Sequence, residues 1–161
     1  MKTRLTNFFL VLTSVLVGLI VVEVGLKVLG IGGLYKSGIS RISDPELRYR
    51  LPGNLFPEID PDGFRNASND GPFDIVILGD SHVYGYGVSA EDSYPKQLAA
   101  ITGKKVYNFG MGGYGPAQYA HLTDKALDLN PDTLVVSLFM GNDPVNACEI
   151  ANLLSYWKNY F

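Results

Sequence analysis

Three apolar runs, each followed by glycine and small polar residues, most tightly limit what this chain can fold into. They occupy residues 73–78, 105–109 and 133–139, and their apolar and β-branched side chains are typical of buried strands. Helices are predicted after each of them, over residues 93–102, 116–129 and 144–160, because apolar residues there recur at helical spacing. Strands that alternate with helices in this way predict an α/β fold with a parallel sheet, in which the third strand is left at an edge.

Small polar residues lie directly after each predicted strand. In an open parallel sheet, ligands bind in the crevice outside the carboxyl ends of the strands. The side chains that follow the three strands are therefore expected to converge on one crevice. The three segments are Gly79-Asp80-Ser81, residues 108–113 and Gly141-Asn142-Asp143.

Ser81 is the candidate nucleophile in this crevice. It closes a tight turn in which Gly79 relieves backbone crowding and Asp80 can accept local backbone hydrogen bonds. A serine placed there exposes its hydroxyl above the sheet, and its peptide N–H offers one donor to a developing oxyanion. The alternative is a Gly-Asp-Ser turn without chemistry, because all three residue types are common in turns.

Gly113 and Asn142 are the other two candidate donors. Gly113 lies in a glycine-dense loop, and its N–H would be the second donor. The same loop matches the G-x-G-x-x-G pattern of dinucleotide sites, but it follows the second strand and no acidic residue closes the next one. The Asn142 amide would be the third donor. Helix capping is the alternative role for Asn142, although Asp143 is expected to cap the last helix, with Pro144 at its first position.

Neither of the two histidines is predicted to be the general base. His82 is adjacent to Ser81, and neighbouring side chains in such a turn diverge. His121 is predicted about two turns into a helix on the flank of the sheet. We expect His82 to line the crevice instead.

The amino-terminal segment, residues 1–34, is predicted to be a transmembrane signal-anchor, with residues 8–34 in the membrane. Residues 8–22 carry no charge, and neither an Ala-x-Ala cleavage site nor a lipobox cysteine follows. A cleaved signal peptide is the alternative. Lys2 and Arg4 precede the apolar run, so the amino terminus is expected to be cytoplasmic and the following domain periplasmic or extracellular.

The remaining chain is predicted to contain a lead-in and one domain. Residues 35–70 are rich in Pro, Gly, Asp and Asn, which indicates a tether and an irregular segment, with a turn at residues 60–63. The domain covers residues 71–161. The net charge of −3 gives no indication of nucleic-acid binding. Cys148 is the single cysteine, which excludes an intrachain disulfide and a cysteine-based metal cluster, and we expect it to be buried.

The three polar segments resemble blocks one, two and three of the SGNH/GDSL hydrolases, a family of serine esterases and lipases. The matching segments are Gly79-Asp80-Ser81, Asn108-x-Gly-x-x-Gly113 and Gly141-Asn142-Asp143. The resemblance implies a flavodoxin-like three-layer α/β/α fold, Ser81 as nucleophile and first oxyanion donor, and Gly113 and Asn142 as the other donors. It implies no metal and no cofactor, and a substrate that bears an ester, such as an acetyl group on a carbohydrate.

The chain departs from the family in its last part. The family's Asp-x-x-His block has no counterpart before Phe161, and only three of the five strands of its sheet are predicted. We therefore expect a truncated member, similar to membrane-anchored bacterial ones, that is inactive on its own; an in-frame Asp-x-x-His in the DNA beyond codon 161 would support this. The alternative is a non-catalytic, degenerate domain that binds a glycan or a partner protein. A third hypothesis is a nucleotide-binding module.

Overall fold

The computed structural model describes residues 2–28 and 41–159, which belong to two separate units. The first unit covers Met1–Ser37 and the second Gly38–Phe161. The last residues of the predicted anchor, 29–34, and the first residues of the predicted tether, 35–40, lie outside the described residues.

The first unit is a single apolar helix, α1 (Lys2–Val28). Its stretch Thr6–Leu26 has a mean hydropathy of 2.5, and none of it is buried. These 21 residues would extend about 30 Å as a helix, which is the thickness of a bilayer's hydrocarbon core. The hydroxyls of Thr13 and Ser14 donate to backbone carbonyls one turn earlier, at 2.8 Å each. The helix is thus long and apolar enough to be a membrane anchor or a signal sequence.

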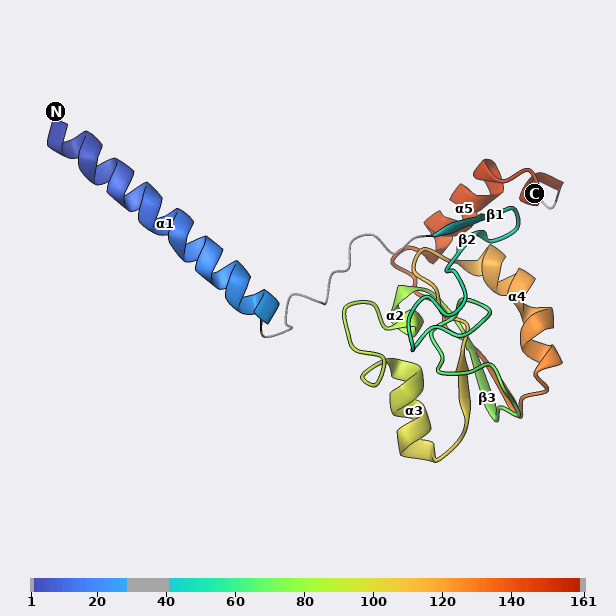
Figure 1. Cartoon of the computed structure of the whole chain (residues 1–161). Helices are drawn as coiled ribbons and strands as arrows, with labels where there is room; N and C mark the ends of the chain where they lie inside the picture. Colours follow the sequence, from blue (N-terminus) through green and yellow to red (C-terminus); the bar gives the residue numbers. More distant parts are fainter. Residues whose placement is uncertain (1, 29–40, 160–161) are drawn as a thin grey trace. The chain divides into compact units, whose positions relative to one another are not determined.

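The second unit contains a three-stranded parallel sheet, as predicted. Its strand order is β4 (Val106–Asn108), β3 (Ile75–Leu78), β5 (Thr133–Val136), as Figure 1 helps to follow. In the register, Ile77 pairs with Asn108 and Leu78 pairs with Val136. The carboxyl ends of all three strands therefore lie at the same end of the sheet, and β5 forms an edge of it.

Helices follow each strand. They are α2 (Ser81–Tyr84), α3 (Tyr94–Thr102), α4 (Pro116–Asp128) and α5 (Asp143–Leu153), with a short 3-10 helix, η2 (Trp157–Asn159). Gly103 ends α3 in the left-handed conformation that its lack of a side chain permits. The helix predicted over residues 144–160 was too long, because the backbone becomes extended at Leu154. There the Trp157 indole donates to the Glu46 carbonyl at 2.7 Å, a contact between distant parts of the sequence.

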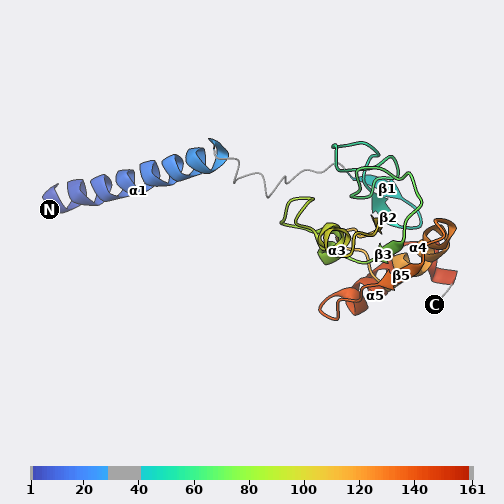
Figure 2. The ribbon, with the colours of Figure 1, turned by 90° about the horizontal axis from the view of Figure 1, so that it is seen from below.

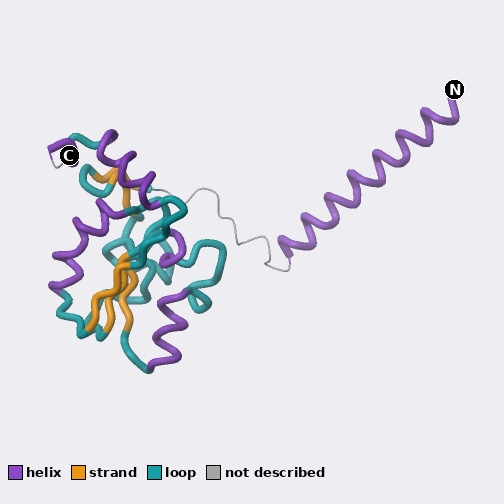
Figure 3. The backbone as a smooth tube through the Cα atoms, turned by 180° about the vertical axis from the view of Figure 1, so that it is seen from behind, coloured by secondary structure: helices purple, strands orange, loops and turns teal. Residues whose placement is uncertain are grey.

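Alternate residues of β3 pack into two different clusters, one on each face of the sheet. Ile75 and Ile77 belong to a small cluster that includes Leu98 of α3. Val76 and Leu78 belong to the main core, together with Leu122 of α4. In Figures 2 and 3 the strands accordingly lie between α3 and α4. Cover on both faces explains why β3 is apolar at every position.

The lead-in contributes a hairpin and part of the main core to this unit. The hairpin consists of β1 (Ile42–Asp44) and β2 (Arg48–Arg50), which pair antiparallel. The predicted turn at residues 60–63 is present, with Gly63 at φ +90° and its N–H bonded to the Asp60 carbonyl at 3.0 Å. After the turn, Phe64 packs against Phe109, with ring centroids 4.7 Å apart.

A buried polar network attaches this turn to strand β4. The Asp60 carboxylate accepts hydrogen bonds from the Tyr107 hydroxyl at 2.6 Å, the Asn66 amide at 2.9 Å and the Phe64 N–H at 3.0 Å. Asn66 in turn exchanges two hydrogen bonds with the backbone of Asn108, at 2.9 and 3.1 Å. Asp60, Asn66, Tyr107 and Asn108 are all buried. The residues of the lead-in are therefore bonded directly to the end of a sheet strand.

Candidate active site

Ser81 is the first residue of α2, directly after the carboxyl end of β3. The buried Asp80 precedes it at the N-cap, and its carboxylate accepts the His82 N–H at 2.9 Å, as the sequence predicted. A side chain on Gly79 would collide with Val83, so this turn requires glycine. The Ser81 hydroxyl is partly exposed and makes no hydrogen bond to any of the described residues. It is therefore free to act on a ligand.

The glycine loop after β4 runs beside Ser81. The Met111 N–H donates to the Gly79 carbonyl at 3.1 Å, and a Cβ on Gly112 would lie 3.7 Å from the Ser81 Cβ. Gly113 has a φ of +83°, which strongly favours glycine. Within the described part of the chain, the N–H groups of Gly112 and Gly113 have no acceptor. Unpaired donors next to a free hydroxyl are what an oxyanion site requires.

Asn108 fixes the glycine loop to α2. Its amide nitrogen donates to the Val83 carbonyl at 3.1 Å, and its amide oxygen accepts the Gly110 N–H at 2.7 Å. A Cβ on Gly110 would come within 2.7 Å of the Val83 carbonyl carbon, so only glycine allows this close approach. Asn108 was predicted only as part of a motif, because its contact with Val83 depends on how α2 packs against the glycine loop.

Asn142 lies at the start of α5, on the third segment. It occupies the N-cap position, but its side chain makes no capping hydrogen bond. Its amide oxygen is buried and has no partner among the described residues, although the residue as a whole is partly exposed. The expectation that Asp143 caps this helix was wrong, because Asp143 is already inside it.

The Asp143 side chain instead bonds to the backbone after β5 and to a tyrosine of α4. It accepts the Phe139 N–H at 2.9 Å and the Tyr119 hydroxyl at 3.2 Å from each carboxylate oxygen. Burial raises the pKa of Asp143, and the nearby charge of Asp80 raises it further, while the Phe139 and Tyr119 hydrogen bonds and His82 oppose the shift. Asp143 thereby holds the segment after β5 against α4 and close to the first segment.

His82 contacts Asp80 of the first segment and Phe139, which lies between β5 and the third segment. Its Nδ1 lies 3.2 Å from each Asp80 carboxylate oxygen, and its ring lies against Phe139, with centroids 4.3 Å apart. Neither His82 nor His121 bonds to Ser81; His121 Nε2 lies 2.9 Å from Glu46 instead. The described residues therefore place the Ser81 hydroxyl beside the glycine loop at Gly112, and neither histidine bonds to that hydroxyl.

Arg65 supports the loop that follows α2, a role that the sequence analysis missed. Its guanidinium donates to the carbonyls of Gly85 at 2.7 Å, Val88 at 3.1 Å and Tyr84 at 3.3 Å. A guanidinium can satisfy several carbonyls at once because its donors lie in a fixed plane. The Arg of the Gly63-Phe64-Arg65 run was visible in the sequence, but its carbonyl partners are reached only through the fold.

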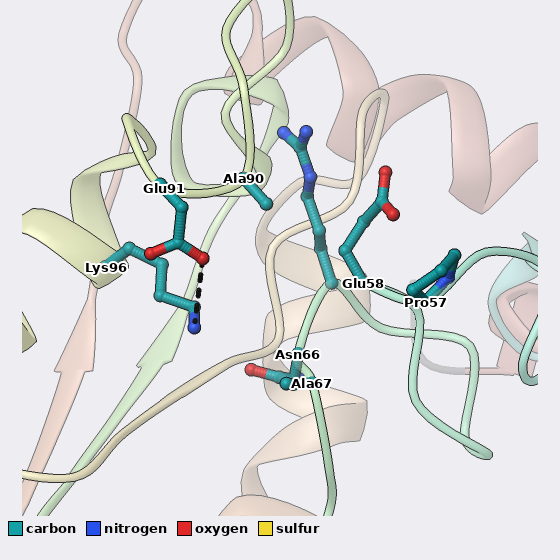
Figure 4. A pocket seen from close by; sticks show the side chains of 8 residues that line it. Pro57, Glu58, Asn66, Ala67, Ala90, Glu91 and Lys96 are labelled. Carbon is teal, nitrogen blue, oxygen red and sulfur yellow. Dashed lines mark ion pairs between the residues drawn. The ribbon is translucent and has the colours of Figure 1, made fainter.

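A hollow of about 300 Å³ lies between the lead-in and the start of α3, away from Ser81. Its lining carries both signs of charge, and in Figure 4 Lys96 pairs with Glu91 across 3.6 Å. Among the residues that the structure describes, no group of three or more His, Cys, Asp or Glu side chains is arranged to hold a metal ion.

Comparison of the chain with protein-family models, curated proteins and solved structures finds no match. The functional argument therefore rests on the geometry of these three strand ends.

Proposed function

We propose that residues 71–161 form the nucleophile and oxyanion-binding part of a serine ester hydrolase site of the SGNH type, on a flavodoxin-like three-layer α/β/α fold. The observation that carries this proposal is the free Ser81 hydroxyl beside Gly112, in a loop where the N–H groups of Gly112 and Gly113 have no acceptor in the described chain. A Cβ on Gly115, at the end of the glycine loop, would lie 3.3 Å from the Asp143 carbonyl oxygen, which supports the approach of the third segment to that loop.

The proposed reaction is nucleophilic attack by Ser81 on an ester carbonyl. The Ser81 oxygen bonds to the carbonyl carbon as its proton passes to a base, and the alcohol then leaves with a proton. The negative oxygen of the intermediate would accept hydrogen bonds from the N–H groups of Ser81 and Gly113 and from the Asn142 amide. Water completes the cycle by hydrolysing the acyl-serine.

We expect this chain to give no practical turnover on its own, because neither histidine bonds to Ser81. Without its base, a triad enzyme retains only what binding and the oxyanion site supply, about a thousandfold to ten-thousandfold over water. The substrate class that we propose is an ester, such as an O-acetylated carbohydrate, and the reaction requires neither metal nor cofactor. The alternative is a non-catalytic domain that binds a glycan or a partner protein. The observation that favours it is that neither His82 nor His121 bonds to Ser81.

Covalent labelling tests the proposal without requiring turnover. The full chain in detergent is treated with a fluorophosphonate, with imidazole added as an external base, and the adduct is located by mass spectrometry. We expect one adduct, on Ser81, that forms faster as imidazole is raised. Ser81→Ala should take up none, whereas Ser89→Ala, which removes an exposed hydroxyl bonded to Asp92, should be labelled normally. Labelling elsewhere, or none, would support the non-catalytic alternative.

We also propose that α1 anchors the domain in the membrane, with its amino terminus in the cytoplasm and residues 71–161 on the other side. The single cysteine tests this orientation. Cys148 is exposed on α5, which contradicts the expectation that it is buried. In intact cells a membrane-impermeant maleimide should label the full chain but not Cys148→Ser. Labelling only after the cells are broken open would show that the domain is cytoplasmic.

A further inference from the structure

The hairpin β1–β2 presents two different faces. Ser43 pairs with Tyr49 in its register, so these two side chains share one face, while Arg48 and Arg50 point to the other. Arg41, one residue before β1, joins the Tyr49 face. Its guanidinium lies over the Tyr49 ring, 4.1 Å from the centroid.

The Tyr49 face lies against the candidate oxyanion loop. The Tyr49 hydroxyl donates a hydrogen bond to the Gly112 carbonyl. A Cβ on Gly113 would lie 2.6 Å from the Tyr49 hydroxyl oxygen. The hydroxyl of Tyr114, from the same loop, donates to the Tyr49 carbonyl at 2.6 Å. Tyr49 thus links the guanidinium of Arg41 to the loop that runs beside Ser81.

Arg41 carries a charge that no carboxylate of the described chain neutralises. Arg48 pairs with Glu149 at 3.5 Å and Arg50 with Asp44 at 3.8 Å, whereas Arg41 is exposed and has no ion pair there. Burial raises the pKa of Tyr49, and Arg41 opposes that shift more than Arg48 does.

The charge of Arg41 also extends to the helix that begins with Ser81. Burial raises the pKa of Tyr84 in α2, and Arg41 is one of the charges that lower it. The geometry places the guanidinium on Tyr49, whose hydroxyl bonds to the glycine loop beside Ser81.

We infer that Arg41 is a specificity residue that binds an anionic group, a carboxylate or a phosphate, on the ester substrate. This inference rests on the proposed function of the Ser81 site. A guanidinium binds either anion through two parallel N–H donors, and its stacking on Tyr49 holds its plane in a defined orientation. A neutral ester of the same shape would lose this interaction and bind more weakly.

Two matched pairs of ligands test the inference and separate the two anions. The carboxylate pair is O-acetylated oligogalacturonate and its methyl-esterified, neutral form. The phosphate pair is 1-acetylglycerol 3-phosphate and 1-acetylglycerol. Binding to the full chain is measured by calorimetry. We expect the anionic member of at least one pair to bind about tenfold more tightly, and this preference to decrease as salt is raised.

Variants of the hairpin then assign the preference to one side chain. Arg41→Gln should abolish the anion preference. Arg41→Lys should retain part of this preference, because lysine keeps the charge but lacks the two parallel N–H donors of a guanidinium. Arg48→Gln is the matched control, since its charge lies on the opposite face beside Glu149, and it should leave the preference unchanged. Equal binding of the anionic and neutral members in both pairs, or equal losses in Arg41→Gln and Arg48→Gln, would overturn the inference.

Failure of the inference can be distinguished from failure of the proposed function. Ser81→Ala should keep the anion preference, because it leaves Arg41 in place, but it should lose fluorophosphonate labelling. If the anion preference is lost in Arg41→Gln but Ser81 is never labelled, the results support the anion site and refute the hydrolase. If Ser81 is labelled but the anionic ligands bind no more tightly than the neutral ones, the results support the hydrolase and refute the anion site.

Discussion

Replacing Asn142 with alanine is expected to slow the labelling of Ser81 by a fluorophosphonate about a hundredfold to a thousandfold, the usual effect of removing one oxyanion donor. The Asn142 side chain makes no capping hydrogen bond and its amide oxygen has no partner in the described chain, so folding makes little use of this amide. Its removal should therefore reduce the rate without lowering the free energy of unfolding appreciably. Pseudo-first-order labelling rates, measured with imidazole present, would show the effect.

Two controls make this result specific. Asn152→Ala removes an amide of the same kind from the exposed side of α5, where it bonds only to the Cys148 carbonyl, and should label at the normal rate. Asn142→Asp keeps the size of the side chain but puts a negative charge near the oxyanion, so it should be at least as slow as Asn142→Ala. If Asn142→Ala is labelled at a rate within a factor of three of that of the unmodified chain, Asn142 is not an oxyanion donor.

Replacing Asp60 with alanine is expected to lower the free energy of unfolding by about 3–5 kcal/mol, because a buried donor left without its acceptor costs about 1–3 kcal/mol. Three donors would lose their acceptor at once: the Tyr107 hydroxyl, the Asn66 amide and the Phe64 N–H. Burial of these groups prevents water from replacing the carboxylate. Urea unfolding of the full chain in detergent, followed by tryptophan fluorescence from Trp157, would measure the change.

Asp62→Ala is the matched control, because Asp62 belongs to the same turn but is only half-buried. Its carboxylate bonds to Asn69 at 3.1 Å and pairs with Lys125 at 3.2 Å. Interactions of this partly exposed kind contribute about 0–1 kcal/mol. Equal losses in Asp60→Ala and Asp62→Ala would mean that the turn, and not the buried network, stabilises the fold.

The main elements of the sheet unit could be predicted because their signals are local. The run of apolar residues before Gly79 predicted β3, and Gly103 predicted the end of α3. The parallel arrangement followed from the alternation of strands and helices, which left β5 at the edge of the sheet. Each of these inferences uses residues within one or two elements.

What could not be predicted depends on contacts between distant parts of the sequence. The β1–β2 hairpin has strands of three residues each, too short for an alternating pattern, and β2 begins at Arg48 with a φ of +74°. The early end of α5 accompanies the bond of Trp157 to Glu46.

The candidate site, too, could be predicted only in part. The positions of Ser81, Gly113 and Asn142 after strand ends followed from the sequence. The partners of Asp143, which are Tyr119 and the backbone of Phe139, depend on how α4 packs against the segment after β5. Tyr49 contacts the glycine loop from 63 residues away, and no local pattern indicates such a contact.

The outer edge of β5 has a practical consequence for handling the protein. No described strand pairs with it, and the chain there exposes Val136 at 48%, Leu138 at 59% and Met140 at 78% without a charge or proline among residues 133–140. Uncharged apolar edges of this kind recruit strands from other molecules and promote aggregation. Removing α1 would therefore not be enough to make a well-behaved soluble sample, whereas a lysine introduced on the outer side of β5 should help.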